Sequence, residues 1–401
     1  MNLMTLAFTM TMTLAASQAQ AAPAAGPAAA ERANAVAFKF YAKEAAKPAN
    51  LFFSPYSLHS AFAMAYEGAK GPTAAQMAAV FNFPPQTKKL RASLKTLNDG
   101  LDAAAKGAQL LQANAFWAEQ DYKFLPAYTG ALTRYYRAEA KPANFKTAAE
   151  VSRRAINAWT EERTKGRITN LFPEGALNAL TRLVLVNAVY FKGNWASPFA
   201  KNLTGEADFT RSDGRKIKVQ MMGFSGTRDL QYGETDSFQL VRLPYAGGGL
   251  AMVVALPKNG KSLADAAAGL SAASLAEMRS VLIEQKTKVF LPRFSFGSGF
   301  ELNGTLSELG MPLAFTDAAD FSNMDGTRRL YIQKAVHKAF VEVNEEGTEA
   351  AAATGIAMGV KSANFGFSLL RADRPFLFLI EDVKSGLILF LGKVEDPTAK
   401  E

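Results

Sequence analysis

The spacing of apolar residues predicts helices in the first part of the chain. Apolar side chains recur at three- and four-residue intervals over 31–47, which indicates one amphipathic helix. The stretch 57–66 is apolar almost throughout and is typical of a buried helix. A further helix is predicted over 88–105, with Thr87 as its N-cap. Its apolar stripe consists of Leu90, Leu94, Leu97 and Leu101.

Strand patterns dominate the rest of the chain. Short runs rich in β-branched and aromatic residues occur at 112–118, 183–191, 239–243, 250–256, 288–291, 335–343, 376–381 and 387–394. Because helices cluster early and strands late, the order favours an α+β fold over a doubly wound parallel sheet. No internal repeat or break in composition suggests a domain boundary, so we expect one domain.

The stretch NEEGTEAAAATGIAMGV at 344–360 has an unusual strand pattern. Its glycines oppose a helix, whereas alternate positions form two distinct faces. One face is small or apolar and suits a core: Thr348, Ala350, Ala352, Thr354, Ile356, Met358 and Val360. The other is small or charged: Glu349, Ala351, Ala353, Gly355, Ala357 and Gly359. The run ends at Lys361 and Ser362, a basic bond of the kind that proteases cleave.

Composition limits the remaining possibilities. The 401 residues include no cysteine, which excludes disulfides, thiol nucleophiles and thiolate metal sites. Residues 1–21 are apolar, uncharged and end in Ala-Gln-Ala, which is typical of a signal peptide. Its removal would leave an alanine- and proline-rich linker over 22–30. We therefore expect an exported protein, secreted or periplasmic, with no other segment long enough to span a membrane.

The histidines give little support for an enzyme. There are two, His59 in a predicted helix and His337 in a predicted strand. A Ser–His–Asp hydrolase needs a presented serine beside one of them, and a zinc site needs more ligands than they provide. We expect hydrogen-bonded structural roles for both, with no metal and no cofactor.

A nucleotide-dependent enzyme is the alternative from another class. The stretch ALPKNGKS at 255–262 follows a predicted strand and resembles a phosphate-binding loop. Pro257, however, removes a backbone N–H from a loop whose purpose is to supply them. A turn between a strand and a helix explains this sequence more simply.

The net charge of +9 raises the question of a polyanionic partner. Lys88, Arg91 and Lys95 fall on one face of a predicted helix, opposite its leucine stripe, and form the candidate polyanion site. A solvated helix face is the commoner explanation for three such charges. We expect no nucleic-acid or membrane partner.

Several stretches together resemble the serpin family. The motifs are NLFFSPYS from Asn50, LVNAVYFKGNW from Leu185, LPRF from Leu291, KAVH from Lys334, EGTEAA from Glu346, RPF from Arg374 and FLGKVEDP from Phe390. They occur in the family's order from about Glu31 to Pro397. The resemblance thus implies a single domain over 31–397, with 398–401 as a C-terminal tail.

This resemblance implies three β-sheets, eight or nine α-helices and an exposed reactive-centre loop in a monomer. In the family's inhibitors, a target protease attacks the loop and forms an acyl-enzyme. The cleaved loop then inserts as a central strand, and the trapped protease is deformed. Such a protein is no enzyme but a suicide inhibitor. Small residues at the start of the loop, the hinge, permit insertion: Gly347, Thr348, Glu349, Ala350, Ala351, Ala352 and Ala353.

Family spacing from Gly347 puts the reactive bond at Lys361 and Ser362. A lysine there implies trypsin-like targets, whose primary pocket is acidic. A shifted register would instead present Met358 or Phe365 to an elastase- or chymotrypsin-like protease. A non-inhibitory serpin, acting as a binding or chaperone-like module, is the other alternative, although the alanine-rich hinge argues against it.

Two buried clusters carry over residue by residue. Ser54, Ser57, Asn187 and His337 match the shutter, a polar cluster beneath the point where the main sheet parts. Trp195, Arg293 and Glu345 match the breach, where insertion begins. Buried polar groups must be hydrogen-bonded, so we expect both clusters to hold the sheet closed yet separable.

Overall fold

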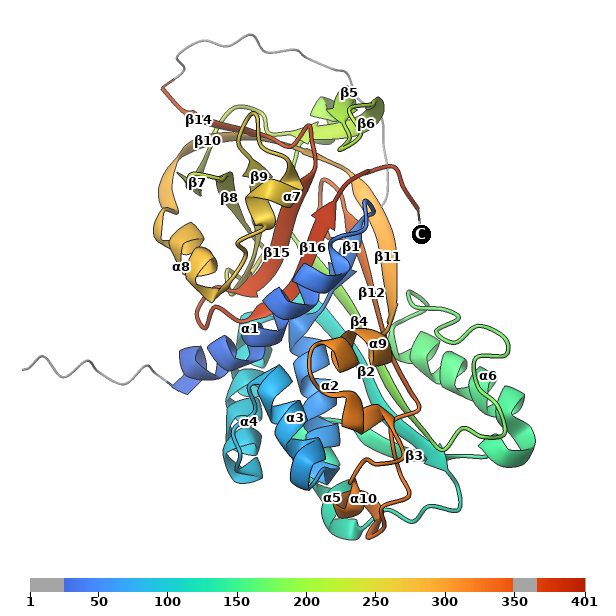
Figure 1. The fold of residues 1–401 in the computed structure, drawn as a ribbon. Helices are drawn as coiled ribbons and strands as arrows, with labels where there is room; N and C mark the ends of the chain where they lie inside the picture. Colours follow the sequence, from blue (N-terminus) through green and yellow to red (C-terminus); the bar gives the residue numbers. More distant parts are fainter. Residues whose placement is uncertain (1–24, 349–365, 401) are drawn as a thin grey trace, which may run out of the picture.

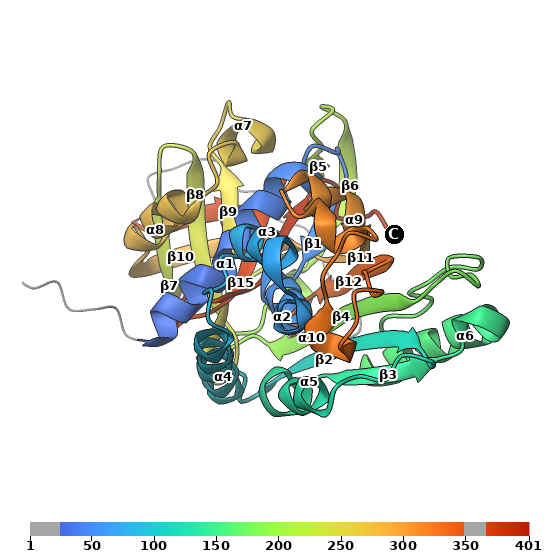
Figure 2. The same ribbon diagram turned by 60° about the horizontal axis from the view of Figure 1, so that its bottom comes forward.

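A computed structural model describes residues 25–348 and 366–400. Most helices gather around one six-stranded sheet, and a larger sheet continues beyond it (Figure 1). Figures 1 and 2 show α6 standing apart from the other helices, beside β2 and β3. The described part contains ten α-helices: α1 (Ala25–Glu44), α2 (Pro55–Gly68), α3 (Gly71–Phe81), α4 (Thr87–Ala104), α5 (Pro126–Ala131), α6 (Phe145–Arg163), α7 (Leu263–Ala267), α8 (Ala272–Ser280), α9 (Leu302–Glu308) and α10 (Ser322–Asp325).

The six-stranded sheet contains the predicted strands at 112–118, 183–191 and 335–343. Its spatial order is β11 (Phe294–Glu301), β12 (Lys334–Val343), β13 (Gly347–Thr348), β4 (Leu183–Asn194), β2 (Ala108–Glu119) and β3 (Glu139–Ala143). Alternation along β4 divides its side chains between two cores. Leu183 and Leu185 face α2, whereas Val184 and Val186 face the cluster around α6.

The larger sheet has ten strands. Its order is β1 (Leu51–Phe53), β16 (Ile388–Val394), β15 (Phe376–Asp382), β9 (Leu250–Pro257), β8 (Phe238–Pro244), β7 (Arg228–Glu234), β10 (Ile283–Pro292), β6 (Lys216–Gly223) and β5 (Gly205–Thr210), with β14 (Ser368–Arg371) also on β10.

The α+β expectation is confirmed, while the element counts differ from those implied by the resemblance. Within the described residues there are two sheets rather than three, because β10 joins two sets of strands. Its first half, 283–287, pairs with β7, and its last three residues, 290–292, pair with β6. The ten α-helices exceed the expected eight or nine because α7 and α10 have only five and four residues.

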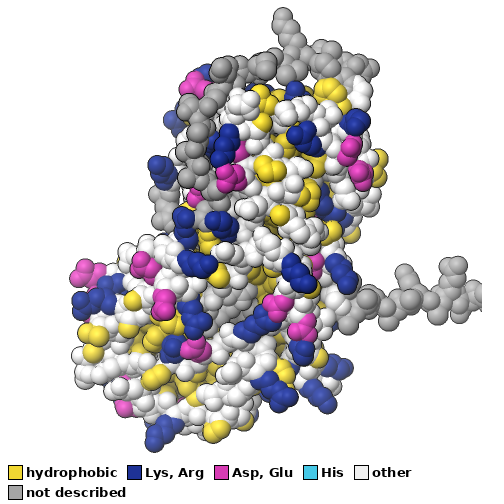
Figure 3. Space-filling view, turned by 180° about the vertical axis from the view of Figure 1, so that it is seen from behind, with side chains coloured by type: hydrophobic (Ala, Val, Ile, Leu, Met, Phe, Trp, Pro, Cys, Tyr) yellow, Lys and Arg dark blue, Asp and Glu magenta, His cyan; other side chains and the backbone are white. Residues whose placement is uncertain are grey.

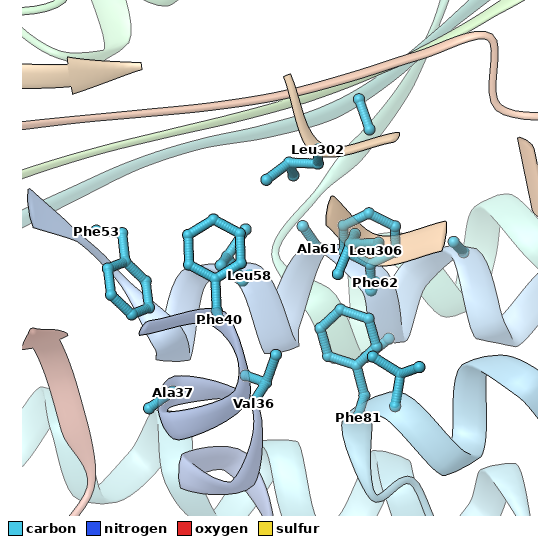
Figure 4. Close-up of a cluster of buried hydrophobic side chains, with 14 of the residues drawn as sticks. Val36, Ala37, Phe40, Phe53, Leu58, Ala61, Phe62, Phe81, Leu302 and Leu306 are labelled. Atoms are coloured by element: carbon cyan, nitrogen blue, oxygen red, sulfur yellow. The ribbon is translucent and has the colours of Figure 1, made fainter. Parts of the chain in front are cut away.

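The helix α2 lies at the centre of the molecule. All of its residues are buried, as its apolar pattern predicts. Figure 4 shows part of the surrounding core, in which Phe40 of α1 and Phe81 of α3 approach Leu58 and Phe62 of α2. The buried position of α2 brings its N-terminal residues against the six-stranded sheet.

Two predicted boundaries are wrong. The helix α1 begins at Ala25, so most of the linker expected over 22–30 is helical, consistent with the high helix propensity of alanine. The helix α4 includes Thr87 as its first residue, and Gln86 takes the N-cap position without a side-chain hydrogen bond. The leucine stripe of α4 is buried as predicted: Leu90, Leu94, Leu97 and Leu101.

Candidate functional site

The six-stranded sheet contains a seam between β4 and β12. These strands pair in parallel, with 184–190 opposite 334–340. Beyond that ladder the two-residue strand β13 lies between them, where Thr348 pairs with Val343 of β12 and with Gly193 of β4. The two strands are therefore joined directly over most of the seam and already separated by a third strand at one end.

Gly347 is fixed by a close approach of backbones at this end of the seam. A Cβ atom at this position would lie 2.1 Å from the carbonyl oxygen of Gly193 and 2.6 Å from Cα of Asn194. No larger residue fits without moving one of the two strands. The glycine thus lets β13 enter the space between β12 and β4.

The shutter residues converge from two strands and one helix. Asn187 of β4 and His337 of β12 are direct partners in the parallel register. The two-residue period places both on the face that meets α2. Ser54 is the N-cap of α2, since its side chain accepts a hydrogen bond from the backbone N–H of Ser57 at 3.1 Å. All four residues are buried.

Their hydrogen bonds fix the tautomer of His337. The backbone N–H of Ser54 donates to Nε2 of His337 at 3.0 Å. The proton of the neutral ring is therefore on Nδ1, which lies 2.5 Å from Oδ1 of Asn187 and donates to it. Burial lowers the pKa of His337 to about 3. The ring is thus neutral at physiological pH, and the cluster holds no buried charge.

The amide of Asn187 completes the network. Its Nδ2 donates to Oγ of Ser57 at 2.6 Å and to Oδ1 of Asn114 at 2.5 Å. Asn114 belongs to β2 and was not among the predicted site residues. Its position opposite Asn187 in the β2–β4 register explains its role. The hydroxyl of Ser54 donates to the carbonyl of Leu389, which ties the cluster to β16.

The breach residues surround the turn between β12 and β13. Glu345 is buried, and its carboxylate accepts from Nε of Arg293 at 2.8 and 2.9 Å and from the hydroxyl of Thr204. Burial alone would raise the pKa of Glu345, but the hydrogen bonds from Arg293 and Thr204 outweigh it and lower this pKa. Thr204 was not predicted, because it follows a short 3₁₀ turn without a periodic pattern.

Trp195 connects the breach to β13. Its indole Nε1 donates to the carbonyl of Asn344 at 2.9 Å, and its backbone N–H donates to that of Glu346 at 2.8 Å. Its ring stacks on Tyr245 with centroids 4.7 Å apart. The hydroxyl of Tyr245 lies 2.8 Å from Oγ1 of Thr348. This chain of contacts holds the first inward side chain of the expected loop strand in the core.

The rest of the predicted loop lies outside the described residues. This applies to Glu349, Ala350, Ala351, Ala352 and Ala353 of the hinge and to the reactive bond at Lys361 and Ser362. It also applies to Met358 and Phe365, which a shifted register would present.

The candidate nucleotide loop has other contacts. Lys258 forms an ion pair with Glu234 at 2.9 Å, and Lys261 donates to Oγ of Ser237. Ser262 caps the five-residue helix α7 by accepting from the N–H of Asp265. These contacts are those of a turn between a strand and a helix.

The candidate polyanion face is largely neutralised. Arg91 donates both Nε and Nη2 to the carboxylate of buried Glu67, and Lys95 pairs with Asp99 at 2.6 Å. Lys88 is exposed. On the face of the molecule in Figure 3, basic side chains are scattered, with acidic ones among them.

The second histidine departs from expectation. Burial lowers the pKa of His59 to about 3, and its ring meets Phe83 edge-on with centroids 4.9 Å apart. Its Nδ1 has no hydrogen-bond partner within residues 25–348 and 366–400. The ring is therefore held by aromatic packing.

Two searches of the described residues found nothing. They contain no group of three or more acidic or histidine side chains that could hold a metal ion. No helix among them is long and apolar enough to cross a membrane.

The family model for "Serpin (serine protease inhibitor)" matches residues 31–397. Serpin B6 of Macaca fascicularis is 40% identical over 354 residues, covering 87% of this chain and 93% of that protein. Leukocyte elastase inhibitor A of Mus musculus is 37% identical over 368 residues, covering 88% and 95%. The crystal structure of native protease nexin-1 with heparin superimposes with a TM-score of 0.83 at 26% identity, covering 93% and 100%. These matches and the seam with its polar clusters show that the chain belongs to the serpin family, whose members are generally inhibitors of serine proteases rather than enzymes.

Proposed function

We propose that this serpin is a suicide inhibitor of trypsin-like serine proteases. The observation that carries the proposal is the position of β13, which already separates β4 from β12 at one end of the seam. A strand that continued from Thr348 in the same direction would separate these two strands further and pair with both. The inhibitory mechanism of the family requires this insertion.

The sequence after Thr348 suits such a strand. Its inward face would consist of small residues first, so that the sheet has to open only slightly at the start. The larger side chains Ile356, Met358 and Val360 would follow. Each gains about 1.5–3 kcal/mol on full burial. Insertion would therefore release its largest hydrophobic contribution late, after the seam has opened.

The chemistry needs only one bond of this chain. The hydroxyl oxygen of the protease's serine attacks the carbonyl carbon of Lys361, and the peptide bond to Ser362 breaks. The new α-amino group of Ser362 leaves with the proton, and an ester joins Lys361 to the protease. Insertion faster than hydrolysis of that ester traps the protease. The lysine, whose cationic side chain suits an acidic primary pocket, points to trypsin-like enzymes.

Cellular location forms part of the proposal. The apolar segment 1–21 would direct export, and the serpin domain over 31–397 would then meet its proteases in the periplasm or outside the cell as a monomer.

A pair of hinge variants tests insertion. Ala350→Arg places a charged side chain on the inward face, where burial without a partner costs several kcal/mol. Ala351→Arg places the same side chain on the outward face and is the matched control. After incubation with trypsin, wild type and Ala351→Arg should form an adduct stable in SDS, whereas Ala350→Arg should be cleaved at the same bond without one. An Ala350→Arg protein that traps trypsin as well as wild type would refute insertion.

The bond itself is tested separately. Lys361→Glu should abolish the trypsin adduct, because a carboxylate cannot enter an acidic pocket without an unpaired buried charge. Mass spectrometry of the released C-terminal fragment of wild type should give Ser362 as its first residue. A fragment that starts after Met358 or Phe365 would instead assign elastase- or chymotrypsin-like targets.

A further inference from the structure

A small cavity of about 220 Å³ lies between α1, α7 and the end of β16, on elements separate from the seam. Its rim consists of four exposed alanines, two from α1 and two from the end of α7: Ala42, Ala46, Ala264 and Ala268. Its deeper wall consists of buried side chains, among them Tyr41, Leu263, Lys393 and Glu395. The cavity is thus apolar at its mouth and charged inside.

The spacing of the alanines explains why the space is open. Ala42 and Ala46 are four residues apart in the region of α1, as are Ala264 and Ala268 at α7, so each pair lies on one side of its helix. Side chains longer than a methyl group at these positions would narrow the entrance.

The ammonium group of Lys393 is fully satisfied. Its Nζ donates to the carbonyls of Ala45 and Lys47 at 2.8 and 2.7 Å and to Oε1 of Glu395 at 3.1 Å. These are the three hydrogen bonds that an ammonium group can donate. Lys393 therefore has no donor left for anything else in the cavity.

The carboxylate of Glu395 is only half satisfied. This residue is 8% exposed, and its Oε2 is buried with no hydrogen-bond partner in the part of the chain that the structure describes. A buried acceptor without a donor is costly, and more so when it carries charge. The cavity thus lacks a hydrogen-bond donor, and it offers an anion as the acceptor.

We propose that this cavity binds a small primary amine. The ammonium group would donate to Oε2 of Glu395, and the alkyl part would lie against the alanine methyl groups. A charged donor forms a stronger hydrogen bond with a carboxylate than a neutral hydroxyl does. The volume is below the roughly 300–1,000 Å³ typical of pockets for drug-sized ligands, which limits the ligand to a short alkyl chain.

The test uses n-butylammonium as the probe, with 1-butanol and butyrate as neutral and anionic counterparts. Binding to the intact protein is measured by titration calorimetry and by the rise in melting temperature with ligand concentration. We expect saturable binding of n-butylammonium, at least tenfold weaker binding of 1-butanol, and no binding of butyrate.

Two variants locate the site. Glu395→Gln should weaken n-butylammonium binding at least tenfold because it removes the anionic acceptor. Ala264→Leu should do the same by filling the mouth, and its exposed position leaves the core untouched. Ala273→Leu, an equally exposed alanine of α8 that does not line the cavity, should bind as wild type does.

Three results would overturn the proposal. They are the absence of saturable binding, equal affinity for 1-butanol and n-butylammonium, and unchanged affinity in both Glu395→Gln and Ala264→Leu. Because no protease is involved, none of these outcomes depends on the inhibitory function proposed above.

Discussion

Replacing Asn187 with alanine should weaken the closed sheet through the shutter alone. The change removes the acceptor for Nδ1–H of His337 and the donor to Oδ1 of Asn114. Both groups lie in buried residues, and each unsatisfied group costs about 1–3 kcal/mol. The free energy of unfolding should therefore fall by about 2–6 kcal/mol. At roughly 2.1 cal/mol/K of unfolding entropy per residue, 401 residues convert this loss into about 2–7 °C of melting temperature.

Differential scanning calorimetry of the uncleaved protein measures this shift. The matched control is Thr160→Ala, which removes one buried hydroxyl bonded to the carbonyl of Ile156 in α6, away from the seam. That single hydrogen bond contributes about 0.5–1.5 kcal/mol, so the control should melt within about 2 °C of wild type. If Asn187→Ala melts no lower than Thr160→Ala, the shutter does not stabilise the closed sheet as argued here.

Three further predictions concern charge. The folded pKa of about 3 for His59 and His337 lies below the usual 6.5, so the unfolded chain binds protons first and stability falls as pH drops from about 6.5 towards 3. Each histidine contributes a slope of about 1.4 kcal/mol per pH unit well below 6.5, and His337→Gln should halve the histidine part of that slope in denaturant titrations; an unchanged slope would contradict this. Glu345 has a lowered pKa, so its stabilising effect is present above the unfolded value near 4.3 and is lost as pH falls through the folded one. Glu345→Gln should be less stable than wild type at pH 7 but should lose less stability between pH 5 and pH 3, and parallel losses would argue against the pairing with Arg293. A sulfated polysaccharide should not speed protease inhibition, because Glu67 and Asp99 already bind two of the three candidate cations; salt-sensitive acceleration that disappears when Lys88, Arg91 and Lys95 are changed to alanine would show the opposite.

Strong periodicity made much of the fold predictable. The leucine stripe of α4 and the alternating pattern of β12 each repeat long enough to fix both the type of element and its buried face. The apolar run at 387–394 likewise corresponds to β16, which begins one residue later. Patterns with several turns or several alternations thus survive tertiary packing.

Short or edge elements were not predictable. The strand β5, at the end of the larger sheet, buries only two of its six side chains and shows no clear alternation. The cap of α4 failed for another reason. A threonine before an apolar stripe is equally compatible with the first helical turn, and only the backbone distinguishes these positions.

The candidate site was predictable where residues occur in recognisable motifs. Asn187, His337, Arg293 and Glu345 form the contacts expected of them. Asn114 was missed although a signal existed, because alternation within 112–118 puts it on the same face as Phe116 and hence towards α2. Tyr245 carried no such signal, since its contact with Thr348 depends on two segments that are 103 residues apart.

The pairing of β4 with β12 has a consequence for the folding kinetics of the chain. Asn187 and His337 are 150 residues apart, so closing the seam is a highly non-local step with a large loop-closure entropy. The turn that joins β12 to β13 is local, with the N–H groups of Asn344 and Gly347 each donating to the carbonyl of the other. Local contacts form before distant ones, so β13 can dock on β12 before β4 arrives. The native sheet is therefore the product of an order of events, and the residues of the shutter contribute to the last of them.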